Sequence, residues 1–430
     1  MTHGTEIQCV EASDFHLRSV NPSSTLAAHS AATPSSDFRP STVKIALLTG
    51  GGDKPYAIGM ATALTAEGFC LDFIGSDDLE VPELLQNPRI TFLNLRGCQR
   101  EEASVIAKAA RVLNYYRRLL AYAAIAKPRI FHILWHNKFA WFDRTLLLCY
   151  YKLLGRSIVV TAHNVNAGKR DAKDSLLNRL SLKCEYSLGD HIFVHTQRMK
   201  DELASDFNIS KSKVSVIPFG INNTVPVTNL SSAEAKHRLG LSGAEKAMLF
   251  FGNIAPYKGL EYLLAAFIEL FNADRNYRLI IVGKPKGENS YWDQLKQVIT
   301  DSSMRGRIIA KIEYVPDEET ELYFKAADVL ILPYTHIFQS GVLFLGYSFG
   351  LPAIAADVGS LREEIIEGET GFVFKPRDSA DLAQAIERYF ASQLSMELEN
   401  RRARIRDYAN EKYSWSKVAT ITATVYSTLL

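Results

Sequence analysis

Residues 247–271 read AMLFFGNIAPYKGLEYLLAAFIELF and carry the pattern that decides the fold. The run AMLFFG is short and continuously apolar, which is typical of a strand covered on both faces. A glycine-edged turn follows, and Leu260–Phe271 then repeats apolar residues at helical spacing. This order predicts one strand–turn–helix unit of a parallel α/β sheet.

The same unit recurs in two blocks along the chain. The first block contains the apolar runs VKIALL, CLDFIG, ITFLNL, RIFHIL, SIVVTA, HIFVH and KVSVIP, and the second contains AMLFFG, YRLIIVG, RIIAKIEY, DVLILPY, LPAIAAD and GFVFKP. Segments of helical length separate them, among them residues 103–126, 142–154 and 176–188. We therefore expect an α/β protein with two doubly wound, Rossmann-like domains that face one another across a cleft. Ligands of such sheets bind beyond the carboxyl ends of the strands.

Composition supports a globular chain and limits its partners. Hydrophobic residues make up 47% and charged residues 22% of the 430 residues, and the formal net charge is +2. This balance gives no general case for nucleic-acid binding. Residues 1–41 are rich in Ser, Thr, Ala and Pro and are predicted to be a disordered tail. The segment Asn222–Ser232 lacks a period and is the expected linker, so the domains should cover residues 42–222 and 223–410.

Cysteine usage and hydropathy point to the cytoplasm. The five cysteines are scattered, odd in number and without a C-x-x-C pair, as expected of reduced thiols that hold no metal. No apolar run reaches the roughly 18 residues of a membrane span. Glu6, Glu11 and Asp14 interrupt any signal-peptide core. We expect a cytoplasmic protein.

Glycine-edged helix starts are the first candidate binding features. Gly50, Gly51 and Gly52 lie between the first strand and its helix, where backbone N–H groups favour an anion. The loop is neither G-x-G-x-x-G nor a Walker loop, and a tight turn without a ligand is the alternative. Gln339, Ser340, Gly341 and Val342 open another helix, for which a capped helix without a ligand is the alternative.

Two polar side chains stand out at strand ends. Lys258 precedes a helix at the point where its ammonium would reach a phosphate, although a solvated surface lysine is the alternative. His163 and Asn164 directly follow the strand SIVV, a position typical of cleft chemistry. A structural histidine is the alternative for His163, and His132 and His136 are weaker candidates.

Five stretches are similar to a known family. FFGNIAPYKGLEYLLAAF, ADVLILPY, GLPAIAADVGSLREEI, GETGFVFKPRD and YSWSKVA resemble the carboxyl half of retaining GT-B glycosyltransferases of family 4. VIPFGIN resembles the joint between that family's two domains. The resemblance covers residues 43–430 and is more specific in the second half than in the first. It implies the GT-B architecture, with a final helix at residues 411–430 that crosses back onto the N-terminal domain.

The resemblance also implies an activity and residue roles. The expected enzyme is a retaining hexosyltransferase that takes a sugar from a nucleotide-diphosphate donor held mainly on the second domain. His163 and Lys258 match the family's catalytic positions. The donor-binding positions are Gly51, Gly52, Asn253, Gln339, Ser340, Gly341 and Val342. The resemblance implies transfer on the front face of the sugar, in which a departing phosphate oxygen takes the acceptor's proton. No cofactor and no metal are expected, since no Asp-x-Asp motif occurs.

Two departures from the family pattern concern charged residues. The family has an arginine shortly before the lysine, and Asn253 and Ala255 occupy the corresponding positions here. It also has two glutamates eight residues apart, for which this chain has Ile337 and Leu345. The chain instead resembles a subset with Gln-Ser-Gly in this loop. In that subset Gln339 would take over a hydrogen bond to the donor.

The acceptor is less defined by the sequence. Tyr115, Tyr116, Arg117 and Arg118, followed by Lys127 and Arg129 and near Phe139, Trp141 and Phe142, fit a peripheral contact with the inner face of a membrane. An ordinary helix with a solvated basic face is the alternative. A membrane contact would fit a polyprenyl-diphosphate-linked acceptor, and a glycan is the other expected acceptor, in exopolysaccharide or cell-envelope synthesis. Two competing hypotheses are a catalytically silent subunit that binds a sugar nucleotide and a nucleotide-sugar 2-epimerase, which would need cleft carboxylates.

Overall fold

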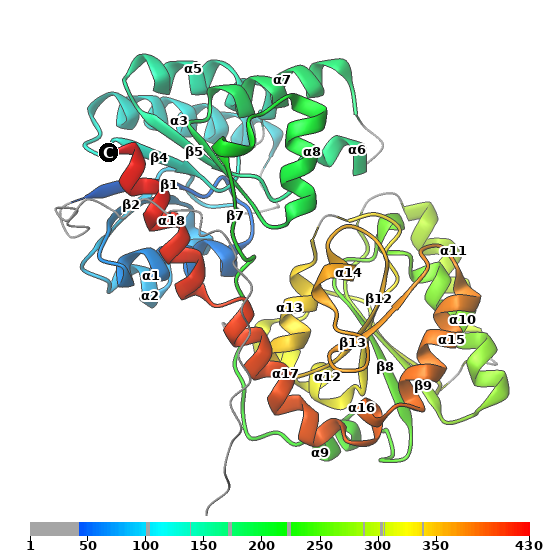
Figure 1. Ribbon diagram of the computed structural model, residues 1–430. Coiled ribbons are helices and arrows are strands. Elements are labelled where there is room, and N and C mark those ends of the chain that lie inside the picture. Colours follow the sequence, from blue (N-terminus) through cyan, green and yellow to red (C-terminus); the bar gives the residue numbers. More distant parts are fainter. Residues whose placement is uncertain are drawn as a thin grey trace, which may run out of the picture. The chain divides into compact units, whose positions relative to one another are not determined.

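The computed structural model describes residues 43–99, 104–137, 139–170, 174–221, 225–286, 289–301, 304, 306–337 and 339–430. The predicted tail at residues 1–41 and the first residues of the predicted linker lie outside these ranges. The prediction of two doubly wound α/β domains is confirmed (Figure 1). Each of the thirteen apolar runs identified in the sequence forms a strand.

The first domain has a seven-stranded parallel sheet in the order β3-β2-β1-β4-β5-β6-β7. Its strands are β1 (Lys44–Leu48), β2 (Cys70–Gly75), β3 (Ile90–Asn94), β4 (Ile130–Ile133), β5 (Ser157–Thr161), β6 (His191–Val194) and β7 (Val214–Val216). Its helices are α1 (Lys54–Ala66), α2 (Pro82–Leu85), α3 (Val105–Ile125), α4 (Ala140–Arg144), α5 (Leu146–Leu153), α6 (Ala167–Arg170), α7 (Leu176–Leu188) and α8 (Gln197–Phe207), with short 3₁₀ turns η2 (Asp77–Leu79) and η3 (Lys211–Lys213). The order turns back at β1 and β4, the switch point at which such sheets bind ligands.

The second domain repeats this plan with a six-stranded parallel sheet in the order β10-β9-β8-β11-β12-β13. Its strands are β8 (Lys246–Phe251), β9 (Tyr277–Val282), β10 (Ile308–Lys311), β11 (Val329–Leu332), β12 (Ala353–Ala356) and β13 (Gly371–Phe374). Its helices are α9 (Ser232–Arg238), α10 (Leu260–Ala273), α11 (Asn289–Thr300), α12 (Asp317–Ala326), α13 (Gly341–Ser348), α14 (Leu361–Glu364), α15 (Ser379–Phe390), α16 (Gln393–Met396) and α17 (Leu398–Lys412), with the 3₁₀ turn η4 (Pro256–Lys258).

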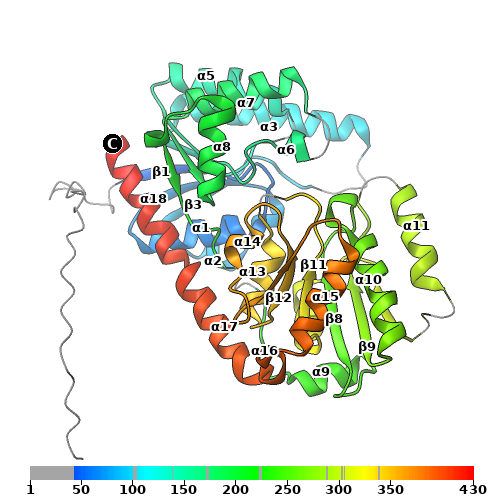
Figure 2. The same cartoon turned by 45° about the vertical axis from the view of Figure 1, so that its right-hand side comes forward.

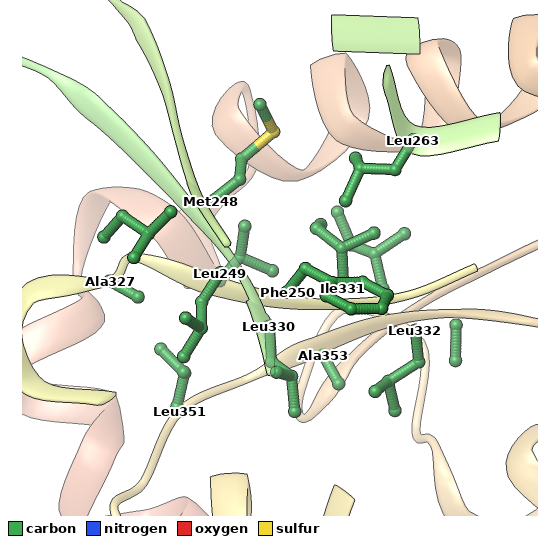
Figure 3. Close-up of a cluster of buried hydrophobic side chains, with 14 of the residues drawn as sticks. Met248, Leu249, Phe250, Leu263, Ala327, Leu330, Ile331, Leu332, Leu351 and Ala353 are labelled. Carbon is green, nitrogen blue, oxygen red and sulfur yellow. The ribbon is translucent and has the colours of Figure 1, made fainter. Parts of the chain in front are cut away.

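The second domain's core explains why the middle of its central strands is apolar. Leu249 of β8 pairs with Ile280 of β9 and Leu330 of β11, and all three side chains are fully buried. Figure 3 shows β8 and β11 side chains packed with Leu263 of α10 on one side and Leu351 on the other. Burial on both faces stabilises such side chains by about 1.5–3 kcal/mol each. The continuous apolar runs of the sequence are the direct result.

One predicted helix is wrong in its extent. Residues 142–154 were expected to form a single helix, but the chain forms α4 and α5, which meet at Thr145. Thr145 has φ −120° and ψ −89°, outside the helical region. Its hydroxyl donates a hydrogen bond to the Trp141 carbonyl at 2.6 Å, which stabilises the break.

The last helix, α18 (Trp415–Leu429), packs against α1 of the first domain, and both views show the two side by side (Figures 1 and 2). The ring of Trp415 lies so close to Gly59 and Gly220 that a Cβ at these positions would come within 2.2 and 2.6 Å of it. Further along α18, the Tyr426 hydroxyl is 2.6 Å from Nδ1 of the fully buried His132 in β4. The C-terminal helix thus completes the core of the N-terminal domain.

No helix within the described ranges is both long enough and apolar enough to cross a bilayer.

Replacing Tyr426 by Phe should destabilise the first domain. The variant leaves Nδ1 of His132 buried without its partner, which costs about 1–3 kcal/mol in the free energy of unfolding. The matched control is Thr420→Ala, which removes an exposed hydrogen bond to Glu67 on the same helix and should cost less than about 0.5 kcal/mol. Urea denaturation followed by circular dichroism measures both. Equal losses would contradict a core role for Tyr426.

Candidate active site

A cavity of about 290 Å³ is lined by residues from both domains. Its second-domain wall is the end of η4 and the segment that enters α13, and its first-domain wall is the start of α1. The joint between the domains and the first residue of α18 complete it. The lining residues are Asp53, Pro55, Tyr56, Phe219, Gly220, Lys258, Ile337, Gln339, Ser340, Gly341, Val342, Leu345 and Trp415.

Lys258 brings a buried ammonium group to this cavity. Its side chain is 6% exposed, and Nζ donates a hydrogen bond to the Tyr334 hydroxyl at 2.6 Å. The turn that places it requires Gly259, which has φ +65° and lies where a Cβ would be 1.9 Å from the Pro333 carbonyl oxygen. The Tyr334 hydroxyl lies 3.2 Å from the Ser340 hydroxyl, and burial raises the pKa of Tyr334 above its ordinary value. The neutral phenol therefore accepts from Lys258 and can donate to Ser340.

The Gln339 amide is buried without a protein partner. Both Oε1 and Nε2 are shielded from solvent, and neither makes a hydrogen bond with any described residue. Leaving a buried polar group unsatisfied costs about 1–3 kcal/mol. Because Gln339 also lines the cavity, a polar ligand there would satisfy this amide.

The start of α13 supplies further positive potential. Ser340 is the N-cap residue, but its side chain makes no capping bond to the helix. The backbone N–H groups of the first turn, beginning at Gly341 and Val342, therefore have no side-chain cap to accept them. A helix start of this kind favours an anion. The structure thus brings together five predicted residues in one cavity: Lys258, Gln339, Ser340, Gly341 and Val342.

The apolar replacements at Ile337 and Leu345 also line the cavity. Each side chain is 8% exposed. Among the described lining residues, Asp53 is the one carboxylate, and its Oδ1 accepts the Tyr56 N–H at 2.9 Å as the cap of α1. The cavity therefore carries little negative charge that would oppose a diphosphate.

Three other predicted donor-binding residues lie outside this lining. Asn253 is exposed. A Cβ at Gly51 would meet the Arg96 guanidinium at 2.4 Å, and one at Gly52 would meet the Trp135 ring at 1.9 Å. Contacts within the protein therefore already explain why this loop needs glycine.

His163 lines a different cavity, of about 240 Å³, at the carboxyl end of β5. Its ring stacks on Trp135 with centroids 4.1 Å apart and meets Tyr56 edge to face at 4.7 Å. Tyr56 also lines the Lys258 cavity, so it lies between the two predicted catalytic residues. The same smaller cavity contains Glu185, whose carboxylate is 2.6 Å from Nε2 of His136.

Hydrogen bonds set the tautomer of His163. His195 Nδ1 lies 3.3 Å from the Ile217 carbonyl oxygen, an acceptor, so Nδ1 carries the proton and Nε2 is free to accept. His195 Nε2 is 3.0 Å from Nδ1 of His163, which must then be the donor. Burial lowers the pKa of His195 to about 4 and that of His163 well below 6.5, so both rings are neutral near pH 7. His163 Nε2 is left as a buried acceptor with no partner among the described residues.

Sequence reasoning missed Arg96, which follows β3 at the same sheet edge. The side chain is 8% exposed, its Nη1 donates to the Ser76 hydroxyl at 3.3 Å, and its Nε has no partner among the described residues. Within that part of the chain no carboxylate forms an ion pair with it, and burial lowers its pKa. Asp78 attracts this guanidinium without forming an ion pair, and a buried guanidinium without a carboxylate in direct contact is costly unless an anion reaches it. Its position directly after the strand ITFLNL could have identified it in the sequence as a candidate binding residue.

A larger cavity of about 590 Å³ shares Ile337 with the Lys258 cavity. Helix α8 contributes Arg198, Asp201, Glu202 and Asp206 to its lining, and Asp357 lies on the other side. With the Lys211 ammonium that pairs with Asp201 included, four carboxylates face two cations, and this negative balance would repel a diphosphate. The smaller cavity around Lys258 is therefore the better anion site.

Comparison with known proteins gives a consistent result for both domains. Residues 50–224 match the family model described as Glycosyltransferase Family 4, and residues 245–392 match the one described as Glycosyl transferases group 1. The chain is a glycosyltransferase of the family 4 type. The D-inositol 3-phosphate glycosyltransferase of Corynebacterium efficiens is 26% identical over 406 residues, which cover 88% of this chain and 90% of that protein.

Solved structures agree on the fold of this glycosyltransferase. A sucrose-phosphate synthase from Thermosynechococcus elongatus is similar with a TM-score of 0.72 and 20% identity, over 90% of this chain and 99% of that one. Anabaena HepE, solved in complex with UDP-glucose, is similar with a TM-score of 0.68 and 16% identity, again over 90% and 99%. These likenesses confirm the predicted GT-B architecture.

Replacing His195 by Asn should impair catalysis through His163, because His163 Nδ1 loses the acceptor that orients it. We expect kcat to fall by about tenfold or more, as for a lost positioning hydrogen bond. The variant also leaves the buried Nδ1 of His163 without its acceptor, so the free energy of unfolding near pH 7 should fall by about 1–3 kcal/mol. The unfolded chain binds a proton near pH 6.5 and folded His195 only near pH 4, so stability is lost as the pH falls between these values. The variant should reduce that slope by about 1.4 kcal/mol per pH unit.

The matched control is His191→Asn, in β6, the strand that His195 directly follows. Burial lowers the pKa of His191 to about 4 as well, but its Nε2 lies 3.0 Å from the Ser215 hydroxyl and not from His163. The control should reduce the slope of stability against pH equally while it leaves kcat unchanged. A loss of kcat in both variants would refute the role of His195 as the acceptor that orients His163.

Proposed function

We propose that this glycosyltransferase transfers a hexosyl group from a nucleotide-diphosphate donor to an acceptor hydroxyl with retention of configuration. The observation that carries the proposal is the convergence of the buried Lys258 ammonium, the uncapped start of α13 and the unsatisfied Gln339 amide on one cavity. All three favour a bound diphosphate. The complex of Anabaena HepE with UDP-glucose adds support, since that protein has a similar fold.

The proposed catalysis depends on the negative charge that develops on the leaving diphosphate. As the bond between sugar and diphosphate breaks, negative charge accumulates on the leaving oxygens. Lys258 and the N–H groups of α13 are fixed before the reaction, so they stabilise this charge without reorganisation. Tyr334 holds the ammonium in place, and the Gln339 amide is available to donate to a phosphate or to a sugar hydroxyl.

Front-face transfer with retention is proposed because both other routes need a free carboxylate. A double displacement needs a side chain that attacks the sugar, an inverting displacement needs a base for the acceptor hydroxyl, and Asp53, the one carboxylate in the described lining, already caps α1. We infer instead that a departing phosphate oxygen takes the acceptor's proton on the same face of the sugar. This route requires no metal ion or cofactor. Nε2 of His163 would accept a hydrogen bond from a sugar hydroxyl, because its tautomer permits only this role.

The acceptor is proposed to be a glycan or a polyprenyl-diphosphate-linked sugar, in exopolysaccharide or cell-envelope synthesis. Arg96 supports an acceptor with an anionic group, because its buried guanidinium has no carboxylate partner in the described structure. The second candidate function is a catalytically silent subunit that binds the donor. The observation that favours it is the apolar character of Ile337 and Leu345 in the cavity wall.

Lys258→Ala should lower kcat by about 10²–10³-fold, as found when one donor to a developing oxyanion is removed. The assay incubates the protein with uridine, guanosine and adenosine diphosphate sugars and measures released nucleoside diphosphate. Lys375→Ala, which removes an exposed lysine of the same domain, is the control and should react as the wild type does. Near-normal turnover of the Lys258 variant would refute the diphosphate role. Donor binding by the wild type without any turnover would support the silent subunit.

Retention is tested on the product itself. With an α-linked donor sugar, proton NMR of the first product formed should show an α anomeric signal. A β signal would contradict the front-face route but not the proposed role of Lys258 at the diphosphate. The two experiments therefore test separate parts of the proposal.

A further inference from the structure

The outer faces of α3, α5 and α7 expose large apolar side chains. The three helices lie side by side over the first sheet in both views (Figures 1 and 2). Their inner sides hold the core, through residues such as Leu119, Leu148 and Leu182. The side chains on the outer faces are between 55% and 87% exposed: Ile106, Leu113, Ile125, Leu146, Leu153, Leu176, Leu177 and Leu180. We call these eight residues the outer apolar surface.

The same helices carry almost exclusively positive charge. Helix α3 has four cations and no acidic residue, α5 has one cation and no acidic residue, and α7 has two cations and one carboxylate. That carboxylate, Glu185, is 4% exposed and bonds inward to His136. No acidic side chain of these three helices is therefore exposed.

Ion pairs at the helix ends leave a net positive surface. Asp190 pairs with Lys152 and Asp174 with Arg179, so these cations are compensated. Arg111, Arg117 and Arg118 instead donate to neutral carbonyl or amide oxygens, and none of them forms an ion pair with a carboxylate in the described part of the chain. Lys183 is exposed beside Leu180 on α7, and both line a cavity that also contains Asp206 of α8.

This surface differs from the one expected from the sequence. Tyr115 and Tyr116 were expected to provide the apolar part of a membrane contact, but they are 5% and 7% exposed and belong to the core. Arg117 and Arg118 are exposed, as are Lys127, Arg129, Phe139 and Trp141 of the expected contact. The leucines of α5 and α7 add to the apolar part.

We propose that the outer apolar surface, with its cations, docks on an anionic lipid bilayer. Apolar side chains on a basic helix face insert at the boundary between headgroups and acyl chains, while the cations bind the anionic headgroups. A second copy of this chain would fit less well, because two such surfaces would bring like charges together. The inference goes beyond the proposed sugar transfer and does not depend on it.

The location connects the bilayer to the sheet edge that holds Arg96. Arg118 of α3 donates to the Leu95 carbonyl at 3.4 Å, and Arg111 donates to that of Cys98. The loop after β3 is therefore held against α3. If α3 lies on the bilayer, the loop that carries Arg96 lies on the same side of the domain as the anionic headgroups.

The test is cosedimentation of the full chain with vesicles in the absence of any donor. Vesicles of phosphatidylcholine with phosphatidylglycerol should bind the wild type more tightly than vesicles of phosphatidylcholine alone. Arg117→Gln with Lys183→Gln should weaken binding to the anionic vesicles by about fivefold for each cation removed. Leu153→Ser with Leu177→Ser and Leu180→Ser should weaken it by about 100-fold or more.

The matched control is Leu85→Ser with Met396→Ser, two exposed apolar residues outside this surface. It should bind as the wild type does, and all variants should keep their melting temperatures because the replaced side chains are exposed. Equal binding of the wild type to both vesicle types, or equal binding by the leucine variant and the control, would overturn the proposal. So would a wild-type dimer in sedimentation velocity that the leucine variant converts to a monomer without any vesicle binding. Release of nucleoside diphosphate with soluble substrates should be unchanged in every variant, which separates this test from that of the transfer reaction.

Discussion

A buried ammonium group is the constraint around which the second domain's site is arranged. Taking the Lys258 charge out of water costs several kcal/mol unless nearby groups compensate it. The Tyr334 hydroxyl and ring provide part of this compensation, and a left-handed glycine places the lysine at the required point of the turn. The start of α13 adds its own positive potential to the same cavity. The positive end of a helix and a buried ammonium group therefore act on one small volume.

The first domain uses neutral groups where the second uses charge. Trp135, Tyr56 and Phe219 surround His163 with rings, and burial keeps both His163 and His195 unprotonated. A neutral acceptor in this place can select a hydroxyl without competing with Lys258 for the diphosphate. The second domain would therefore stabilise the charged part of a donor, and the first domain would recognise its hydroxyl groups.

The fold was readable from the sequence, because strands buried on both faces must be continuously apolar. The runs from VKIALL to GFVFKP therefore gave both sheets. The grouping of Lys258 with residues 339–342 was predictable for a similar reason, since carboxyl ends of parallel strands share an edge. Three findings could not be predicted from the local sequence. Two are contacts between distant residues, namely the packing of Gly51 on Arg96 and the pairing of His163 with His195. The third is the exposure of Asn253, which depends on how the rest of the domain packs. The break at Thr145 depends on one side-chain hydrogen bond, which periodicity does not register.

The place of α18 has a consequence for how the chain folds during synthesis. The second domain's sheet and most of its core are built from consecutive residues, so they can form as they leave the ribosome. The first domain's core includes Val418, Val425 and Tyr426 from the last fifteen-residue helix, although its strands are made long before. Part of one face of its sheet therefore stays exposed, and open to contacts with other chains, until residues 415–429 have been synthesised. The domain made first is the one that can be completed last.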